Sequence, residues 1–160
     1  MEVIEVAHEH GPQRAANACD QPQNAALDAT PSEPHVDTLS ILYVEDNDHL
    51  RETIGMLMEQ HDRVIVLCAN AEDALAECAQ AQFDLVITDV SLPGMPGTEL
   101  CRRLLMARPA QWIALCSGYD FGHAILHLGP NVRSLGKPFE LERLDELIAE
   151  VAAARKASRP

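Results

Sequence analysis

The sequence is poor in aromatic and basic residues and has no long apolar run. Aromatic residues make up only 4% of the 160 residues, so a core must be built mainly from aliphatic side chains and alanine. The 12 Lys and Arg residues are outnumbered by 25 Asp and Glu residues, and the net charge of −13 argues against direct nucleic-acid binding. No apolar run approaches the roughly 18 residues of a membrane span, and no signal peptide is recognisable. We therefore expect a cytoplasmic protein without membrane insertion.

The cysteines show no spacing typical of a metal site. None of the five forms a close pair of that kind, and three of them sit in apolar runs, where cysteine serves as a small core residue. The five are Cys19, Cys68, Cys78, Cys101 and Cys116. This usage fits a reducing compartment such as the cytosol.

The composition changes near residue 38. Residues 1–38 hold four of the ten prolines and seven acidic residues against a single arginine. Such a segment buries too little apolar surface to repay the entropy of ordering, so we expect a disordered extension or linker. The remaining length suits one domain, predicted at 39–155, followed by a small basic tail at 156–160.

From residue 39 onward, strand patterns alternate with helical patterns. Strands are expected at 41–44, 64–68, 83–89, 112–116 and 132–136. Helices are expected from Asn47 or Asp48 to about 58, at 71–81 after a cap at Asn70, around 100–105 and from about 139 to 151, with a short or weak helix within 118–130. Near-continuous apolar strands predict a doubly wound α/β fold: a five-stranded parallel sheet of flavodoxin-like order 2-1-3-4-5 with helices on both faces.

Four of these strands end at or next to residues with ionisable or hydroxyl side chains. Glu45 and Asp46 follow the first strand, Asp89 ends the third, Ser117 follows the fourth and Lys137 follows the fifth. In a parallel sheet these ends lie along one edge, and the order 2-1-3-4-5 places the first and third strands side by side at the switch point. Acids, a hydroxyl and an amine gathered there suit chemistry on a phosphoryl group beside a divalent cation.

Three carboxylates close together need something to offset their repulsion. Each pair repels by about 4 kcal/mol at ~4 Å and an effective dielectric near 20. A protonated acid is one solution, and a hard cation such as Mg²⁺ is the other. Lys137 can pair with Asp89 at rest and with a phosphoryl oxygen after transfer, and Ser117 offers a hydroxyl donor. Taken singly, each residue also fits a plainer role as a helix cap, a turn or an exposed helix boundary.

The motifs around these residues resemble the receiver domain of two-component response regulators, from about Ser40 to Ala154. The matching segments are Ile41-Leu42-Tyr43-Val44-Glu45-Asp46-Asn47, the run from Asp84 to Met95, Ser117-Gly118 and Lys137-Pro138-Phe139. The resemblance implies a phosphoacceptor rather than a turnover enzyme. It would take a phosphoryl group from a histidine kinase or phosphotransfer protein and signal to a protein target through a conformational change.

The resemblance also assigns roles to single residues. Asp89 would accept the phosphoryl group and, with Asp46, bind Mg²⁺ directly. Glu45 would act largely through water, and the backbone carbonyl of Ser91 would complete the protein ligands. Two further residues would hold the phosphoryl oxygens, Ser117 and Lys137.

Two positions depart from the family pattern. Ser134 stands where the family usually has an aromatic switch residue, so a ring rotation there cannot report phosphorylation. Tyr119 lies where family side chains influence attack by water on the acyl phosphate, so its bulk is predicted to slow dephosphorylation, although a contact with a partner fits equally well. The weak helix within 118–130 likewise predicts that the usual signalling face of the family is altered or unused.

Alternative functions remain open at this point. A degenerate receiver acting as a phosphorylation-independent binding module is one, although Glu45, Asp46, Asp89, Ser117 and Lys137 are all present. An aspartate-nucleophile phosphatase of the haloacid dehalogenase type is less favoured, because it needs a second aspartate where Ser91 stands. We expect a stand-alone regulator, a phosphorelay intermediate or a receiver from a hybrid kinase, with no output domain after the last helix.

Overall fold

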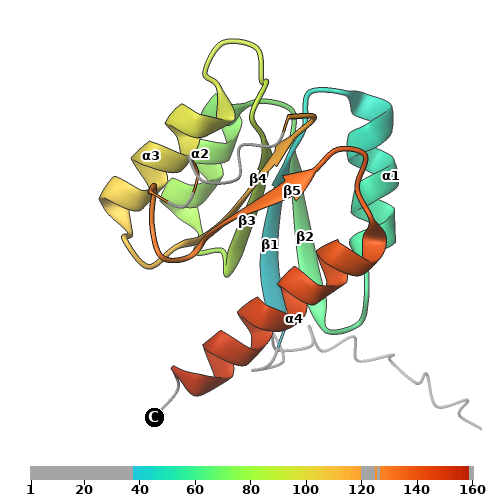
Figure 1. The fold of residues 1–160 in the computed structure, drawn as a ribbon, viewed down its shortest axis with the longest axis vertical. Coiled ribbons are helices and arrows are strands. Elements are labelled where there is room, and N and C mark those ends of the chain that lie inside the picture. Colours follow the sequence, from blue (N-terminus) through green and yellow to red (C-terminus); the bar gives the residue numbers. More distant parts are fainter. Residues whose placement is uncertain (1–37, 120–124, 126, 159–160) are drawn as a thin grey trace, which may run out of the picture. The chain divides into compact units, whose positions relative to one another are not determined.

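The computed structural model describes residues 38–119, 125 and 127–158 (Figure 1). The extension predicted at 1–38 therefore lies outside the described residues, apart from Thr38 itself. Within the described ranges, no helix is both long and apolar enough to cross a membrane.

Five strands and four helices alternate over most of the described chain. The strands are β1 (Leu39–Val44), β2 (Arg63–Cys68), β3 (Leu85–Asp89), β4 (Trp112–Ser117) and β5 (Val132–Gly136). The helices are α1 (Asp48–Met58), α2 (Ala71–Gln80), α3 (Gly97–Ala107) and α4 (Leu141–Ala157). All strand pairs are parallel, and the order β2-β1-β3-β4-β5 confirms the predicted flavodoxin-like topology.

The sheet is covered on both faces, which confirms the doubly wound arrangement. Figure 1 shows α2 and α3 together on one face and α1 and α4 on the other. Because side chains alternate along each strand, the buried residues separate into two clusters, one on each face. The fully buried side chains of the strands are almost all aliphatic, as the low aromatic content required, with Tyr43 as the one aromatic exception in this set within the described chain.

Two helix starts follow from asparagine caps that the sequence predicted. The Asn47 side chain accepts a hydrogen bond from the Leu50 backbone N–H at 2.9 Å, at the start of α1. The Asn70 side chain accepts one from the Asp73 N–H at 2.8 Å, at the start of α2. Each bond satisfies one of the backbone donors that the first turn of a helix leaves open. The first cap also fixes the turn that carries Glu45 and Asp46.

The last helix is longer than the apolar pattern indicated. It continues to Ala157, so Lys156 and Ala157, which were predicted to belong to the tail, are part of α4 together with Arg155. The Arg155 guanidinium donates to the Thr38 carbonyl at 2.5 Å and to the Asp84 carboxylate at 3.1 Å, and this carboxylate also accepts from the Ser40 N–H. These contacts fasten the end of α4 to the edge of the sheet opposite the predicted site, which apolar periodicity alone does not reveal.

The segment between β4 and β5 differs from the other connections. The described residues there, 118–119, Ile125 and 127–131, form bends, turns and irregular backbone without a helix. Residues 120–124 and 126, which belong to the weak helix predicted within 118–130, lie outside the described residues. Ile125 is buried in the cluster beneath α2 and α3, so this connection still contributes to the core.

Candidate functional site

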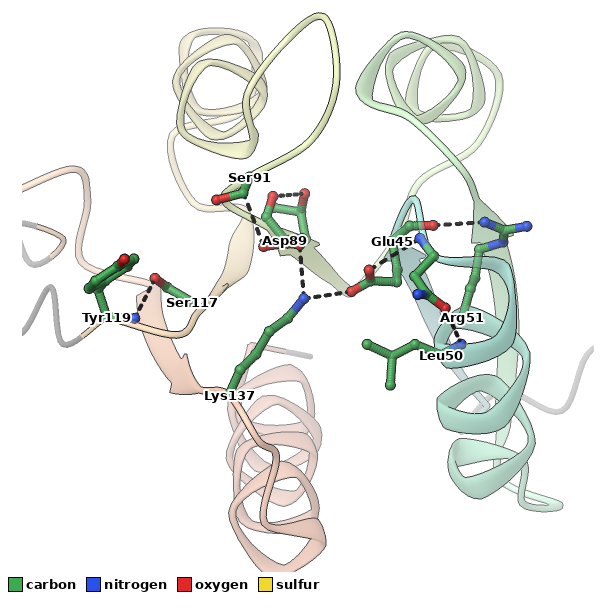
Figure 2. A network of polar contacts seen from close by, with 10 residues as sticks. Glu45, Leu50, Arg51, Asp89, Ser91, Ser117, Tyr119 and Lys137 are labelled. Carbon is green, nitrogen blue, oxygen red and sulfur yellow. Dashed lines mark hydrogen bonds and ion pairs between the residues drawn. The ribbon is translucent and has the colours of Figure 1, made fainter.

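The structure places the strand ends that carry ionisable or hydroxyl residues along one edge of the sheet. Glu45 follows β1, Asp89 is the last residue of β3, Ser117 is the last residue of β4, and Lys137 follows β5. Figure 2 shows the Lys137 ammonium between Glu45 and Asp89, with Ser117 on the neighbouring strand end. Glu45 and Asp89 are buried, whereas Asp46 is exposed. The predicted strand order thus brings distant acids together.

The Lys137 ammonium forms two ion pairs at once. Its Nζ lies 2.8 Å from Asp89 Oδ2, which is the resting pair that the sequence predicted. It also lies 2.7 Å from Glu45 Oε2, a contact that the sequence analysis missed. Burial alone would lower the pKa of Lys137, but the hydrogen bonds and charges of Asp89 and Glu45 outweigh this effect and raise it. The side chain therefore stays protonated and shares its charge between two acids.

Both oxygens of the Asp89 carboxylate are held. Oδ2 accepts from Lys137, and Oδ1 accepts from the Ser91 backbone N–H at 3.1 Å. The second bond comes from the loop that follows β3, two residues along the chain. The carboxylate is thereby oriented at the mouth of the site by one charged and one backbone donor.

Three carboxylates are close enough to share a cation. Glu45, Asp46 and Asp89 each offer an oxygen, and these oxygens all lie within 4.8 Å of one another. Oxygen donors of this charge and number suit a hard divalent cation such as Mg²⁺, which is commonly held by one or two carboxylates together with water. The residues present therefore fit a magnesium site.

The carboxylate of Glu45 is tied to the turn that follows β1. Its Oε1 accepts from the Asn47 backbone N–H at 3.3 Å, while its main-chain carbonyl accepts from an Arg51 guanidinium nitrogen at 2.8 Å. Arg51 also binds the exposed Asp48 at 2.6 Å, so one arginine of α1 braces both ends of the turn. Sequence reasoning did not find Arg51, although an arginine within the first turn of a helix after two acids was a signal. Asp48 is accordingly an exposed ion-pair partner at the start of α1.

Ser117 lies at the same edge but makes a local contact. Its Oγ accepts a hydrogen bond from the Tyr119 backbone N–H at 3.0 Å. Among the described residues, no hydrogen bond joins the Ser117 hydroxyl to Asp89 or Lys137, although the Lys137 backbone N–H donates to the Ser117 carbonyl at 2.8 Å. The Tyr119 side chain is 82% exposed, so its ring is available at the rim of the site.

Sequence reasoning also missed the close approach of Gly97 to the backbone of Asp89. Gly97 begins α3, and a Cβ added to it would lie 1.9 Å from the Asp89 carbonyl oxygen. No side chain fits there without displacing the end of β3. Its backbone N–H donates to the Val90 carbonyl at 3.0 Å, which closes the loop of residues 91–96 over the end of β3. Glycine immediately before a helical pattern was the available signal, but the sequence gives no distance.

Comparison with known proteins identifies the family. The sequence profile of the response regulator receiver domain matches residues 41–149, which is more than half of the chain. The chain therefore belongs to this family, the receiver domains of two-component systems. The match spans every strand end described above.

Several relatives with similar sequences are sensor proteins and histidine kinases. The chain is 39% identical over 151 residues to the virulence sensor protein BvgS of Bordetella bronchiseptica, covering 87% of this chain and 12% of that protein. It is 33% identical over 132 residues to the sensor histidine kinase AruS of Pseudomonas aeruginosa, covering 79% and 13%. The chain thus spans only about an eighth of the length of these relatives.

Solved structures show the same fold. The chemotaxis response regulator CheY4 of Vibrio cholerae superimposes with a TM-score of 0.64 at 24% identity, covering 71% of this chain and 98% of that one. A response regulator receiver domain protein from Clostridium thermocellum gives a TM-score of 0.68 at 21% identity, covering 76% and 99%. At these identities the likeness concerns the fold alone.

Proposed function

We propose that this chain is a phosphoacceptor: Asp89 takes a phosphoryl group from a phosphohistidine in a Mg²⁺-dependent reaction. The observation that carries the proposal is the position of the Lys137 ammonium, 2.8 Å from Asp89, beside three carboxylate oxygens within 4.8 Å of one another. A protein that only bound a partner would have no need to keep an acid, a group of cation-binding carboxylates and an ammonium together at one edge of the sheet.

The reaction forms one bond and breaks another. A carboxylate oxygen of Asp89 attacks phosphorus in line with the P–N bond, and the electron pair of that bond returns to the imidazole of the donor. Lys137 releases part of its hold on Asp89 and pairs with a phosphoryl oxygen, while the Ser117 hydroxyl donates to another. Because transfer needs little covalent chemistry from the protein, these residues act by positioning and by charge.

The acids hold the cation in this scheme. Asp46 and Asp89 would bind Mg²⁺ directly, the Ser91 carbonyl would complete the protein ligands, and Glu45 would act largely through water. When bound, the cation neutralises charge on the phosphoryl oxygens and on the clustered carboxylates. The exposed Asp46 is open to solvent, which suits a cation that keeps several water ligands.

The donor and the target are proteins in this proposal. The donor is the phosphohistidine of a histidine kinase or phosphotransfer protein, and the histidine kinases among the relatives favour this class. Phosphorylation would then shift the population of existing conformations toward one that a downstream protein recognises. Consistent with an autocatalytic phosphoacceptor, we assign no turnover activity, and the setting we propose is the cytoplasm.

Incubation with acetyl phosphate and Mg²⁺ tests the proposal. Intact-mass spectrometry is expected to show one added phosphoryl group on the wild-type chain, none on Asp89→Asn, and the wild-type result on Asp48→Asn. Asp48 is a matched control because it is an exposed aspartate only two residues from Asp46. Lack of label on a folded wild-type chain would favour the phosphorylation-independent binding module, and steady release of phosphate from small esters would favour a phosphatase.

A further inference from the structure

Tyr43 carries a buried hydroxyl that no other group engages. The side chain is fully buried on β1, and its Oη has no hydrogen-bond partner in the described part of the chain. The only other buried side-chain atom of this kind there belongs to Arg63, which lies 3.7 Å from an Asp145 carboxylate oxygen. Buried hydroxyls are almost always hydrogen-bonded, so an unused donor in this place calls for an explanation.

The strand geometry directs Tyr43 toward the candidate site. Residues two apart on a strand share a face of the sheet, so Tyr43 and Glu45 lie on the same face. That face is the one covered by α1 and α4, and Cys116 belongs to the same cluster beneath the end of β4. A tyrosine side chain is about as long as the two-residue step along a strand, so the Tyr43 hydroxyl can reach the Glu45 carboxylate on the same face.

The surroundings of the phenol are acidic. Burial is the main cause that raises the pKa of Tyr43, and the charges of Glu45, Cys116 and Asp89 and the closeness of the hydroxyl to the Glu45 carboxylate raise it further. Burial likewise raises the pKa of the Cys116 thiol, so this neighbour is neutral and offers no strong acceptor. The phenol therefore keeps its proton, and the first acceptor it faces is the Glu45 carboxylate.

Glu45 is the group whose partner must change. At rest its Oε2 accepts from Lys137, and the residue is only 2% exposed. In the proposed function, Lys137 turns to a phosphoryl oxygen on Asp89. A buried carboxylate oxygen then loses its donor close to a buried hydroxyl that lacks an acceptor, and one hydrogen bond would satisfy both.

We propose that Tyr43 is a positioning residue: its hydroxyl donates to the Glu45 carboxylate when Lys137 leaves it. The exchange keeps Glu45 oriented toward the cation while the ammonium serves the phosphoryl group. The inference rests on the proposed function for the movement of Lys137, but the contact itself can be tested without metal or phosphate.

The metal-free test observes Tyr43 directly. The sequence contains two tyrosines, so Tyr119→Phe leaves Tyr43 as the single signal in a chain labelled with ¹³Cζ-tyrosine. In that background, Lys137→Met removes the resting partner of Glu45 and is expected to move the resonance downfield, as a phenol does when it donates to a carboxylate. Adding Glu45→Ala is expected to abolish the movement. An unmoved resonance in Lys137→Met, or the same movement without Glu45, would overturn the proposal.

A second test measures Mg²⁺ binding in the presence of beryllofluoride by calorimetry. Tyr43→Phe removes one oxygen and keeps the ring, and it is expected to weaken binding about tenfold, the range for a hydrogen bond to a charged group. In a Glu45→Ala background, the same change is expected to have less than a twofold effect. Equal weakening in both backgrounds would mean that the hydroxyl acts only on folding and would refute the inference.

Different results would refute the positioning role of Tyr43 and the phosphoacceptor function. If acetyl phosphate labels the wild-type chain and the effects of Tyr43→Phe and Glu45→Ala are independent, the positioning role is wrong and the phosphoacceptor function stands. If the wild-type chain takes no label, the function is wrong, while the resonance of Tyr43 in the metal-free Lys137→Met chain still decides whether the hydroxyl reaches Glu45.

Discussion

Replacing Lys137 with methionine removes the positive charge from the site while keeping most of the side chain's length. In the resting structure this ammonium bridges Glu45 and Asp89, which are both largely buried. Without it, two carboxylates face one another with no cation between them. The folded state should therefore lose free energy even though no part of the apolar core is touched.

The structure sets the size of this loss. At 2.7 and 2.8 Å, each ion pair is worth roughly 6 kcal/mol at a dielectric near 20, before the cost of removing the ions from water is subtracted. Breaking a buried pair costs about 3–5 kcal/mol in measured cases. Because the Lys137 side chain is still 22% exposed, water screens part of the interaction, and we expect a loss of about 2–3 kcal/mol.

Urea unfolding at neutral pH without divalent cations measures this loss. Lys156→Met is the matched control, because Lys156 is the only other lysine and is exposed near the end of α4. It should change the free energy of unfolding by no more than about 0.5 kcal/mol. Saturating Mg²⁺ should then stabilise Lys137→Met more than the wild-type chain, because the cation supplies the charge that the variant lacks.

Two results would refute this reasoning. If Lys137→Met is no less stable than Lys156→Met, the two ion pairs contribute nothing to the folded state. If Mg²⁺ stabilises the variant and the wild-type chain equally, the cation does not bind among the acids that Lys137 holds.

Three further predictions concern the same edge of the sheet. Gly97→Ala should lower the free energy of unfolding, measured with urea, by about 2 kcal/mol or more, and it should slow labelling of Asp89. Gly136→Ala should be nearly neutral, because nothing lies within 4 Å of its added Cβ. Equal effects of the two changes would contradict the close approach at Gly97. Because the pKa of Lys137 is raised in the folded state, its contribution to stability is complete below about pH 10.5 and is lost as the pH rises through the pKa of the folded state. If the difference in the free energy of unfolding between the wild-type chain and Lys137→Met stays constant through alkaline pH, this prediction is wrong. Tyr119→Ala should shorten the lifetime of the phosphorylated state, followed by intact mass after removal of acetyl phosphate, and an unchanged lifetime would count against the predicted role of its bulk.

The arrangement of the strands could be predicted because it depends on patterns that the sequence states directly. Apolar runs of the right length alternate with helical patterns, and the ends of those runs place Glu45, Asp89, Ser117 and Lys137 at one edge. Parallel pairing then brings β1 and β3 together whatever the details of packing. For this reason the fold and the clustering of these residues followed from the sequence.

The finer contacts could not be predicted, because they depend on reach and on free space. Whether Lys137 also meets Glu45 depends on side-chain length and on the twist of the sheet. The extent of α4 depends on an arginine, Arg155, that reaches back to Asp84 at the opposite edge. The need for glycine at position 97 depends on a carbonyl oxygen that no apolar pattern locates.

The two hydrogen bonds on Asp89 make its oxygens unequal before any donor arrives. A free carboxylate rotates and offers either oxygen, but here a half-turn would break the contacts with Ser91 and Lys137 together. The acceptor is therefore desymmetrised by its surroundings. An incoming phosphoryl group therefore meets two oxygens with different partners, one held by an ammonium and the other by a backbone N–H.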